Sequence, residues 1–260
     1  MEQVDTYRHQ GLRKQLVEVL RTNVYAKNPN TKKDEISRHG IKDEKVLNAI
    51  AEIPRHLLFD SSDTVLHITQ AYEDKAFPIG EGQTISQPWT VARQSELLDV
   101  KPGEKILEIG TGSGYQALVL MLLKAKVYSI ERHKILYERT SKLLPVMKEL
   151  ILSRRPVKEN SAPRTWKNEP EYWNVKCFYG DGFEGLPMHA PFDKILITAA
   201  VPELPKKLLQ QLVVGGKMVL PFGSQHNCDM VRITKHGEDQ YETEKFEKFA
   251  FVPMLKGIVS

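Results

Sequence analysis

The spacing of apolar residues predicts alternating strands and helices through the second half of the chain. Apolar runs with the length of buried strands occupy residues 105–109, 127–130, 175–181 and 192–202. Helices are predicted between the first three runs, at residues 115–123 and 134–152, the second with Pro145 as a site for a kink. This alternation is typical of an α/β fold with a doubly wound, mostly parallel sheet.

The first 80 residues have a different pattern. Residues 12–20 and 46–53 carry apolar side chains at helical spacing, and Pro54 stops the second helix. We therefore expect residues 1–80 to form a helical cap over the ligand crevice of a core at 81–260. Between the two helices, residues 25–33 are polar and contain Asn-Pro, which is typical of an exposed loop.

The C-terminal part returns to strands. A helix with proline at its start is expected at residues 202–212, followed by a strand at 217–223. Two more strands are expected at residues 230–234 and 245–255. A His-Gly-Glu-Asp turn at 236–239 makes these two an antiparallel pair, which we place at the edge of the sheet.

Charge and cysteine content exclude several classes of protein. The 37 basic and 33 acidic residues are scattered, which does not point to a nucleic-acid partner. Cys177 and Cys228 lack the spacing of a metal site or a disulfide scaffold. No run approaches the ~18 apolar residues of a membrane span, and the N-terminus lacks an apolar leader. We therefore expect a cytoplasmic protein with one domain, 1–260, and no membrane, nucleic-acid or metal contacts. We also expect a monomer, although the sequence itself does not give the oligomeric state.

The Gly-rich turn after residues 105–109 discriminates between nucleotide ligands. A dinucleotide fingerprint needs a third glycine where Tyr115 stands, and Glu108 beside the turn would repel a pyrophosphate but suits a cation. Glu131, 21 positions after Gly110, is placed to accept hydrogen bonds from two ribose hydroxyls. The pattern E-x-G-x-G-x-G resembles the first motif of class I S-adenosylmethionine-dependent methyltransferases, whose ligand carries a sulfonium. The alternative is a strand–helix turn without a ligand.

A second segment, GQTISQP at residues 82–88, makes the resemblance more specific. Thr84 and Ser86 lie two apart, so on an extended segment both hydroxyls point to one side and can donate to a carboxylate. The alternative is a Ser/Thr-rich turn that caps a helix at residues 91–98. Together with residues 40–59, this segment resembles the protein-L-isoaspartate O-methyltransferase family. Most of the chain aligns with that family in order.

The resemblance implies a reaction and its site. The family transfers a methyl group from S-adenosylmethionine to the free carboxylate of an L-isoaspartyl residue in a damaged protein or peptide, and the ester then closes to a succinimide, which starts repair. Ser86 is implied as the active-site residue. The implied cofactor-binding residues are Thr84, Ser86, Gln87, Glu108, Gly110, Thr111, Gly112, Ser113, Glu131, Arg132, Gly180, Asp181, Gly182 and Thr198. The implied substrate-binding residues are Ile85, Ser86, Ala199, Ala200 and Val201.

The chemistry explains why no general base is visible. An aspartyl-type carboxylate has a reference pKa of about 3.9, so the nucleophile is already ionised at neutral pH. Asp181, in a Gly-Asp-Gly turn after a strand, would accept from the adenine amino group; the alternative is a plain turn. Small residues at 198–200, at the C-terminal end of a strand, leave room for a substrate main chain.

Two segments depart from the family, and other functions stay open. Residues 25–39 and 153–172 are insertions of unassigned role, and whether Leu255 and Lys256 contact the substrate is open. A methyltransferase for another substrate class would keep the Gly-rich turn but need not contain GQTISQP. A non-catalytic module that binds a partner through the insertions is a further alternative.

Overall fold

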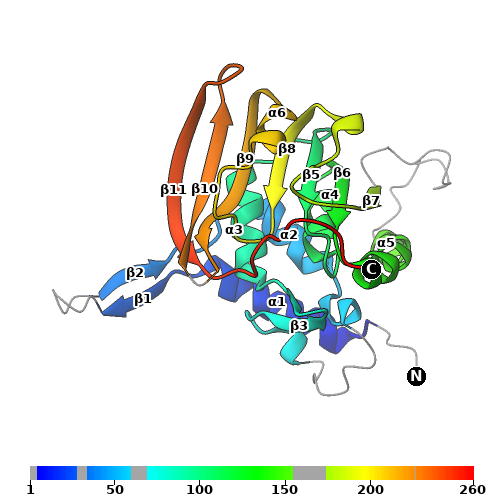
Figure 1. Ribbon diagram of the computed structural model, residues 1–260. Helices are drawn as coiled ribbons and strands as arrows, with labels where there is room; N and C mark the ends of the chain where they lie inside the picture. Colours follow the sequence, from blue (N-terminus) through cyan, green and yellow to red (C-terminus); the bar gives the residue numbers. More distant parts are fainter. Residues whose placement is uncertain (1–4, 28–33, 60–68, 155–173, 226) are drawn as a thin grey trace, which may run out of the picture.

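A mixed sheet of seven strands forms the centre of the molecule (Figure 1). The computed structural model describes residues 5–27, 34–59, 69–154, 174–225 and 227–260. Within them the sheet has the order β11-β10-β9-β8-β5-β6-β7. Its strands are β5 (Lys105–Ile109), β6 (Lys126–Glu131), β7 (Val175–Tyr179), β8 (Phe192–Ile197), β9 (Leu212–Ser224), β10 (Asn227–Lys235) and β11 (Tyr241–Phe249).

Strand directions confirm the predicted fold class. Strands β7, β6, β5, β8 and β9 pair in parallel, whereas β9, β10 and β11 pair antiparallel and make one edge. From β5 the chain goes to β6 and β7 on one side and then returns to β8 on the other side. The strand order therefore reverses between β5 and β8, and the carboxyl ends of these two strands form the place where open α/β sheets bind ligands.

Side chains alternate between two apolar layers because successive residues of a strand point to opposite faces of the sheet. One layer holds Ile106, Val127, Leu196 and Val219, and the other holds their neighbours Leu107, Tyr128, Ile195 and Leu220. Helices α3 (Pro88–Leu98), α4 (Tyr115–Leu122) and α5 (Lys134–Ser153) cover the first layer, and α6 (Lys206–Gln210) covers the second. The sheet is thus covered on both faces.

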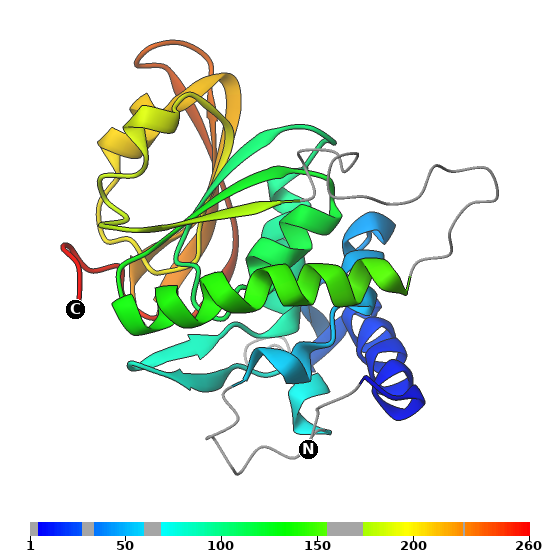
Figure 2. The same cartoon turned by 90° about the vertical axis from the view of Figure 1, so that its right-hand side faces the viewer.

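The N-terminal helices extend the first layer outward. Helix α2 (Glu44–Glu52) packs on α3 and α4, and α1 (Tyr7–Arg21) packs on α2 (Figures 1 and 2). Leu20, Leu47 and Ile50 are almost completely buried there. Both predicted helices are therefore confirmed. They lie against the core helices, however, and not over the ligand crevice.

Three sequence predictions differ from the structure. The predicted loop at 25–33 is in its described part a strand, β1 (Val24–Lys27), which is paired with β2 (Asp34–Arg38) as an exposed ribbon. The helix predicted at 202–212 is shorter in the structure, where α6 covers only Lys206–Gln210. Proline at 205 cannot occupy a helix interior, so the helix begins after it. The last strand ends at 249, and residues 250–255 leave the sheet. The insertion at 153–172 lies mostly outside the described residues.

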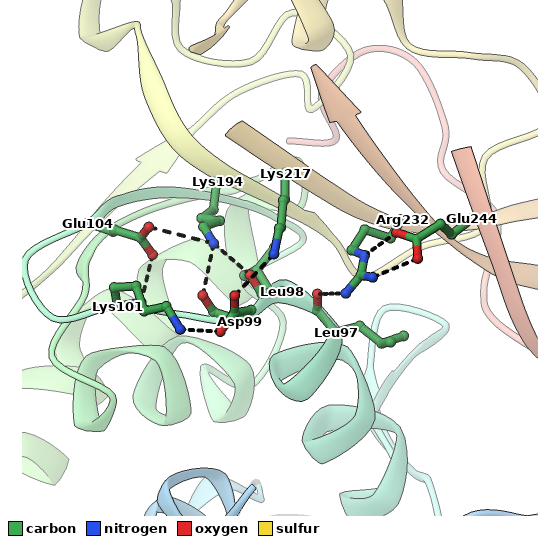
Figure 3. A network of polar contacts seen from close by, with 9 residues as sticks. All are labelled: Leu97, Leu98, Asp99, Lys101, Glu104, Lys194, Lys217, Arg232 and Glu244. Carbon is green, nitrogen blue, oxygen red and sulfur yellow. Dashed lines mark hydrogen bonds and ion pairs between the residues drawn. The ribbon is translucent and has the colours of Figure 1, made fainter. Parts of the chain in front are cut away.

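Helix α3 ends against a network of basic side chains, of which Lys194 is buried (Figure 3). Lys194 is only 5% exposed, and its Nζ donates to the carbonyls of Leu98 (2.9 Å) and Asp99 (2.8 Å). The guanidinium of Arg232 donates to the carbonyl of Leu97. The last carbonyls of a helix have no partner within the helix, so these cations satisfy them.

Replacing Lys194 with methionine is therefore expected to lower the free energy of unfolding by about 2 kcal/mol, because two carbonyls lose their buried donor. Lys101→Met is the matched control, since the side chain of Lys101 is 60% exposed and pairs with the same Asp99. The control should change stability by less than about 0.5 kcal/mol. Chemical denaturation of both variants measures the difference; equal losses would contradict the assignment.

Candidate cofactor and substrate clefts

Two adjoining clefts open at the carboxyl ends of β5 and β8. The first has a volume of about 820 Å³ and the second about 710 Å³, both including space open to solvent. Four residues line both clefts: Thr84, Ser86, Thr198 and Val252. The two spaces therefore meet at a wall that carries three hydroxyl groups, on which a reaction between two bound molecules can take place.

Much of the first cleft is formed by predicted cofactor residues. It is lined by Thr84, Ser86, Gly110, Thr111, Gly112, Ser113, Glu131, Arg132, Gly182 and Thr198, all of which were predicted. It is also lined by Gln83, Val91, Tyr115, Gln116, Ile130, His133 and residues 252–255, which were not. Leu255 therefore lines the cleft, whereas Lys256 does not.

The turn after β5 requires glycine at its first position. Gly110 has φ +96°, and a Cβ there would lie 2.5 Å from Oγ1 of Thr198. The Thr198 hydroxyl cannot simply turn away, because it donates to the carbonyls of Ile109 (2.9 Å) and Gly110 (3.0 Å). The end of β8 thus holds the turn in place, with backbone groups facing the cleft.

Glu131, at the end of β6, links the Gly-rich turn to the next strand. Its Oε2 accepts from the amide of Gly112 and its Oε1 from the amide of His133, both at 2.9 Å. A carboxylate has about four acceptor positions, so two remain free for a ligand. Since Glu131 lines the cleft, the fixed carboxylate suits the paired hydroxyls of a ribose.

Glu108, which was predicted beside the cofactor, does not line either cleft. It is 0% exposed below the turn, where Ser129 Oγ donates to its Oε2 and Thr111 Oγ1 lies 2.6 Å from Ser129 Oγ. Burial raises the pKa of Glu108 to about 8. The carboxyl group is therefore mostly protonated at neutral pH and does not present a negative charge to a sulfonium. It supports the turn through Ser129 and Thr111.

The turn after β7 is also arranged differently from the prediction. Gly182 lines the first cleft, but Gly180 and Asp181 do not. The Asp181 carboxylate accepts from the amides of Phe183 (2.9 Å) and Gly257 (2.7 Å). Asp181 thus ties the C-terminal segment to the sheet, and that segment supplies residues 252–255 to the cleft wall.

The segment after the hairpin of β3 (Phe77–Gly80) and β4 (Gln83–Ile85) carries the hydroxyl wall. Thr84 and Ser86 share one side, as predicted, and face both clefts. Ile85 points the other way and is 1% exposed, so its side chain packs in the core and lines neither cleft. Gln87 lines only the second cleft.

The end of β8 contributes less to the substrate side than predicted. Ala199 lines the first cleft, while Ala200 and Val201 are almost fully buried and line neither. The amide of Ala200 donates to the carbonyl of Val252, and the amide of Met254 donates to the carbonyl of Ala200. The C-terminal segment therefore lies beside the end of β8 and covers Ala200 (Figure 1, red).

The second cleft contains hydroxyl groups but no charge in its described wall. Its hydroxyls come from Thr84, Ser86, Thr90 and Thr198, of which that of Thr198 already donates its proton to the turn after β5. Its other lining residues are Ala76, Gln87, Gln225, Ala250, Phe251 and Val252. Hydroxyl groups can donate to a carboxylate without neutralising it. The cleft therefore suits an anionic group that must stay reactive.

A sheet whose order reverses at the cleft, a Gly-rich turn and a carboxylate at the end of the second strand define a Rossmann-like methyltransferase. Two solved structures share this fold. One, described as a protein-L-isoaspartate O-methyltransferase of Plasmodium falciparum with S-adenosyl-L-homocysteine, has TM-score 0.67 and 20% identity and covers 95% of this chain and 98% of its own. Another protein-L-isoaspartate O-methyltransferase has TM-score 0.68 and 23% identity, with coverages of 93% and 65%.

Sequence comparison identifies the family. The profile described as Protein-L-isoaspartate(D-aspartate) O-methyltransferase (PCMT) matches residues 29–258, so the chain belongs to this family. It is 45% identical over 252 residues to a protein-L-isoaspartate O-methyltransferase of Christiangramia forsetii, covering 97% of this chain and 98% of the relative. A relative with the same description in Flavobacterium psychrophilum is 44% identical, with the same coverage.

Proposed function

We propose that this protein transfers a methyl group from S-adenosylmethionine to the free carboxylate of L-isoaspartyl residues in proteins and peptides. The observation that carries the proposal is the pair of clefts that meet at Thr84, Ser86 and Thr198, in a chain that belongs to this family. The methyl ester closes spontaneously to a succinimide that can reopen to aspartate, which gives the activity its role in repair.

The first cleft fits S-adenosylmethionine, which supplies an electrophilic methyl group when bound. Glu131 keeps two acceptor positions for the ribose hydroxyls. The turn at Gly110 leaves no room for a side chain, so a ligand can approach its backbone closely. Thr111, Gly112, Ser113, Arg132 and Gly182 complete the proposed cofactor wall. Among the predicted cofactor residues, Glu108 and Asp181 act by supporting this wall.

The second cleft positions the nucleophile. Since the isoaspartyl carboxylate has a pKa of about 4, it is ionised at neutral pH and needs no base. Ser86 orients one carboxylate oxygen, and Thr84 and Thr198 flank it on the shared wall. Orientation of this kind can contribute about 7 kcal/mol or more to a reaction between two bound groups. An uncharged wall suits the step because the opposite charges of carboxylate and sulfonium are neutralised in the transition state.

The direct test is transfer of labelled methyl from S-adenosylmethionine to two peptides that differ only in L-isoaspartate or aspartate at one position. Base-labile label in the isoaspartyl peptide alone is the expected result. If neither peptide is labelled while S-adenosylhomocysteine still binds, the substrate assignment is wrong and another substrate class must be sought.

Replacing Ser86 with alanine is expected to lower kcat for the isoaspartyl peptide about 10-fold, because one carboxylate oxygen loses its orienting donor. The dissociation constant for S-adenosylhomocysteine should stay within about twofold, a change of about 0.4 kcal/mol. Ser141→Ala, on the exposed side of α5, is the control. Steady-state kinetics and calorimetry separate the two effects; unchanged turnover would remove Ser86 from the mechanism.

We propose further that the chain acts as a cytoplasmic monomer with one domain, 1–260, and without nucleic acid. One apolar layer includes both Leu20 of α1 and Val219 of β9, which supports a common core for residues 1–80 and the 81–260 region. Cys177 and Cys228 are free thiols, which suits a reducing compartment. Within the described part of the chain, none of the helices combines the length and apolarity needed to cross a membrane.

A further inference from the structure

Ser86 is attached to the N-terminal region through one buried arginine. Arg55 lies in the short helix η1 (Arg55–Leu58) and is 1% exposed. Its Nη1 donates to the carbonyl of Ala71 (2.6 Å), and its Nη2 donates to the carbonyls of Lys75 (2.9 Å) and Ser86 (3.0 Å). One guanidinium thus joins three chain segments, and the last of them is the active-site segment itself.

The charge of Arg55 has no partner of opposite sign in contact. No carboxylate of the described residues lies within ion-pair distance of it; instead its guanidinium faces the rings of Phe59 (5.5 Å), Phe77 (5.7 Å) and Tyr115 (5.4 Å). Burial lowers the pKa of Arg55 to about 10, so the group is still a cation at neutral pH. An unpaired buried cation costs free energy compared with an apolar side chain, and here the hydrogen bonds to three backbone carbonyls offset that cost.

The residues that follow Ser86 are held from another side. Asp74 Oδ1 accepts from the amide of Trp89 (2.8 Å), and Asp74 Oδ2 accepts from Nε2 of Gln87 (3.1 Å). Arg38 pairs with the same Asp74 carboxylate. These contacts fix the start of α3. The main chain of Ser86 lies just before this fixed point and just after Ile85, which pairs with Phe77, and the bond from Arg55 restrains its carbonyl between them.

The side chain of Ser86 is left free by these contacts. Its Oγ has no hydrogen-bond partner within the described residues, although Ser86 lines both clefts. The molecule therefore fixes the backbone of Ser86 firmly and reserves its hydroxyl for a ligand. That combination is expected for a group that must be preorganised toward a reacting atom.

We propose that Arg55 is a positioning residue for methyl transfer, which acts by holding the carbonyl of Ser86 so that the Ser86 hydroxyl points at the substrate carboxylate. Arg55 itself lines neither cleft. It reaches the shared wall through its hydrogen bond to Ser86 and also faces the ring of Tyr115, which lines the first cleft, so the test must separate an effect on turnover from one on cofactor binding. This inference rests on the proposed function. It predicts that loss of Arg55 lowers turnover while leaving cofactor binding intact, and that the loss depends on the Ser86 hydroxyl.

The test is a double-mutant cycle that combines Arg55→Lys with Ser86→Ala. Lysine keeps the charge but cannot bridge three carbonyls with a planar fork. Arg55→Lys alone should lower kcat for the isoaspartyl peptide about 10-fold, since small misplacements of positioning groups have effects of this size or larger. In the Ser86→Ala background the same change should lower kcat less than about twofold, because the hydroxyl it positions is gone. The affinity for S-adenosylhomocysteine should stay within about twofold in all variants, about 0.4 kcal/mol.

A second buried arginine provides the matched control. Arg13 is 5% exposed and donates to the carbonyl of Ala51 and to Asp5, in the same N-terminal region but away from Ser86. Arg13→Lys should lower the melting temperature as Arg55→Lys does, but leave kcat unchanged. All assays are run well below the melting temperature of each variant. Arg55→Gln, which keeps a planar donor, replaces Arg55→Lys if that variant does not fold.

The outcomes separate this inference from the proposed function. If the wild-type protein does not label the isoaspartyl peptide, the proposed function fails before any variant is made. If it does, an equal loss of kcat from Arg55→Lys with and without the Ser86 hydroxyl overturns the positioning role. An equal loss of kcat from Arg13→Lys overturns it as well, because it would show that any damage to the N-terminal region has this effect.

Discussion

Replacing Gly110 with alanine is expected to weaken the binding of S-adenosylmethionine by about 100-fold or more, which corresponds to about 3 kcal/mol. Two effects add. At φ +96° a side chain is strained, and its Cβ would lie 2.5 Å from Oγ1 of Thr198. To relieve the clash, the turn must shift into the cleft or Thr198 must give up its bonds to the carbonyls of Ile109 and Gly110. Either change alters the surface against which the cofactor lies.

The matched control is Gly103→Ala. Gly103 also has a positive φ, +87°, but a Cβ there meets nothing within 4 Å, and the residue does not line either cleft. The Gly103→Ala variant should be less stable than the wild type because of backbone strain, but it should bind S-adenosylhomocysteine with wild-type affinity. Calorimetric titration with S-adenosylhomocysteine compares the two variants. Similar affinities would mean that the turn tolerates the side chain and that Gly110 is a structural glycine only.

The sequence predicted the sheet well because its signals are local. Strands β5, β6 and β8 are largely apolar runs, and Gly110 and Glu131 stand at the ends of two of them. Parallel strands bring their carboxyl ends to one edge, so the relative place of these residues follows once the topology is known. The confirmed fold class and antiparallel edge depend on such signals alone.

The parts that were missed depend on contacts between distant segments. The sequence predicts that residues 250–255 continue a strand, yet they leave the sheet and form a cleft wall. Backbone bonds to Ala200 hold this wall, and the carboxylate of Asp181 holds the residues just after it through the amide of Gly257. Nothing in the local pattern reports a bond between residues 181 and 257. Alternation could have placed one side chain in advance: Ile85 lies between Thr84 and Ser86, so its side chain had to face the core.

Glu108 shows that the local sequence pattern also fails to predict the protonation state of a side chain. Its position before the Gly-rich turn suggested a charge beside the ligand, but the strand direction turns its side chain away from both clefts. Because it is completely buried, its pKa rises to about 8, even though the hydrogen bond that it accepts from Ser129 acts in the opposite direction. A motif therefore indicates which residue type is needed, whereas the protonation state depends on burial, which the motif does not contain.

Glu131 supplies the negative charge in the first cleft instead, and its replacement by glutamine is expected to weaken the binding of S-adenosylmethionine about 100-fold. Glutamine has the same shape but only one acceptor oxygen. Whichever way it is oriented, its amino group faces one of the two amides, of Gly112 or His133, that now donate to Glu131. Loss of one loop bond and of the charge-assisted bonds to the ribose hydroxyls amounts to about 3 kcal/mol.

The control for this change is Glu138→Gln, an exposed position on α5 that lines neither cleft and should keep wild-type affinity. Calorimetry with S-adenosylhomocysteine gives both affinities, and thermal unfolding without ligand shows how much of the loss comes from the turn itself. Since Glu131 does not contact the second cleft, kcat at saturating cofactor should fall much less than affinity. A variant that binds normally but turns over slowly would place Glu131 at the reacting groups, contrary to the assignment of the two clefts.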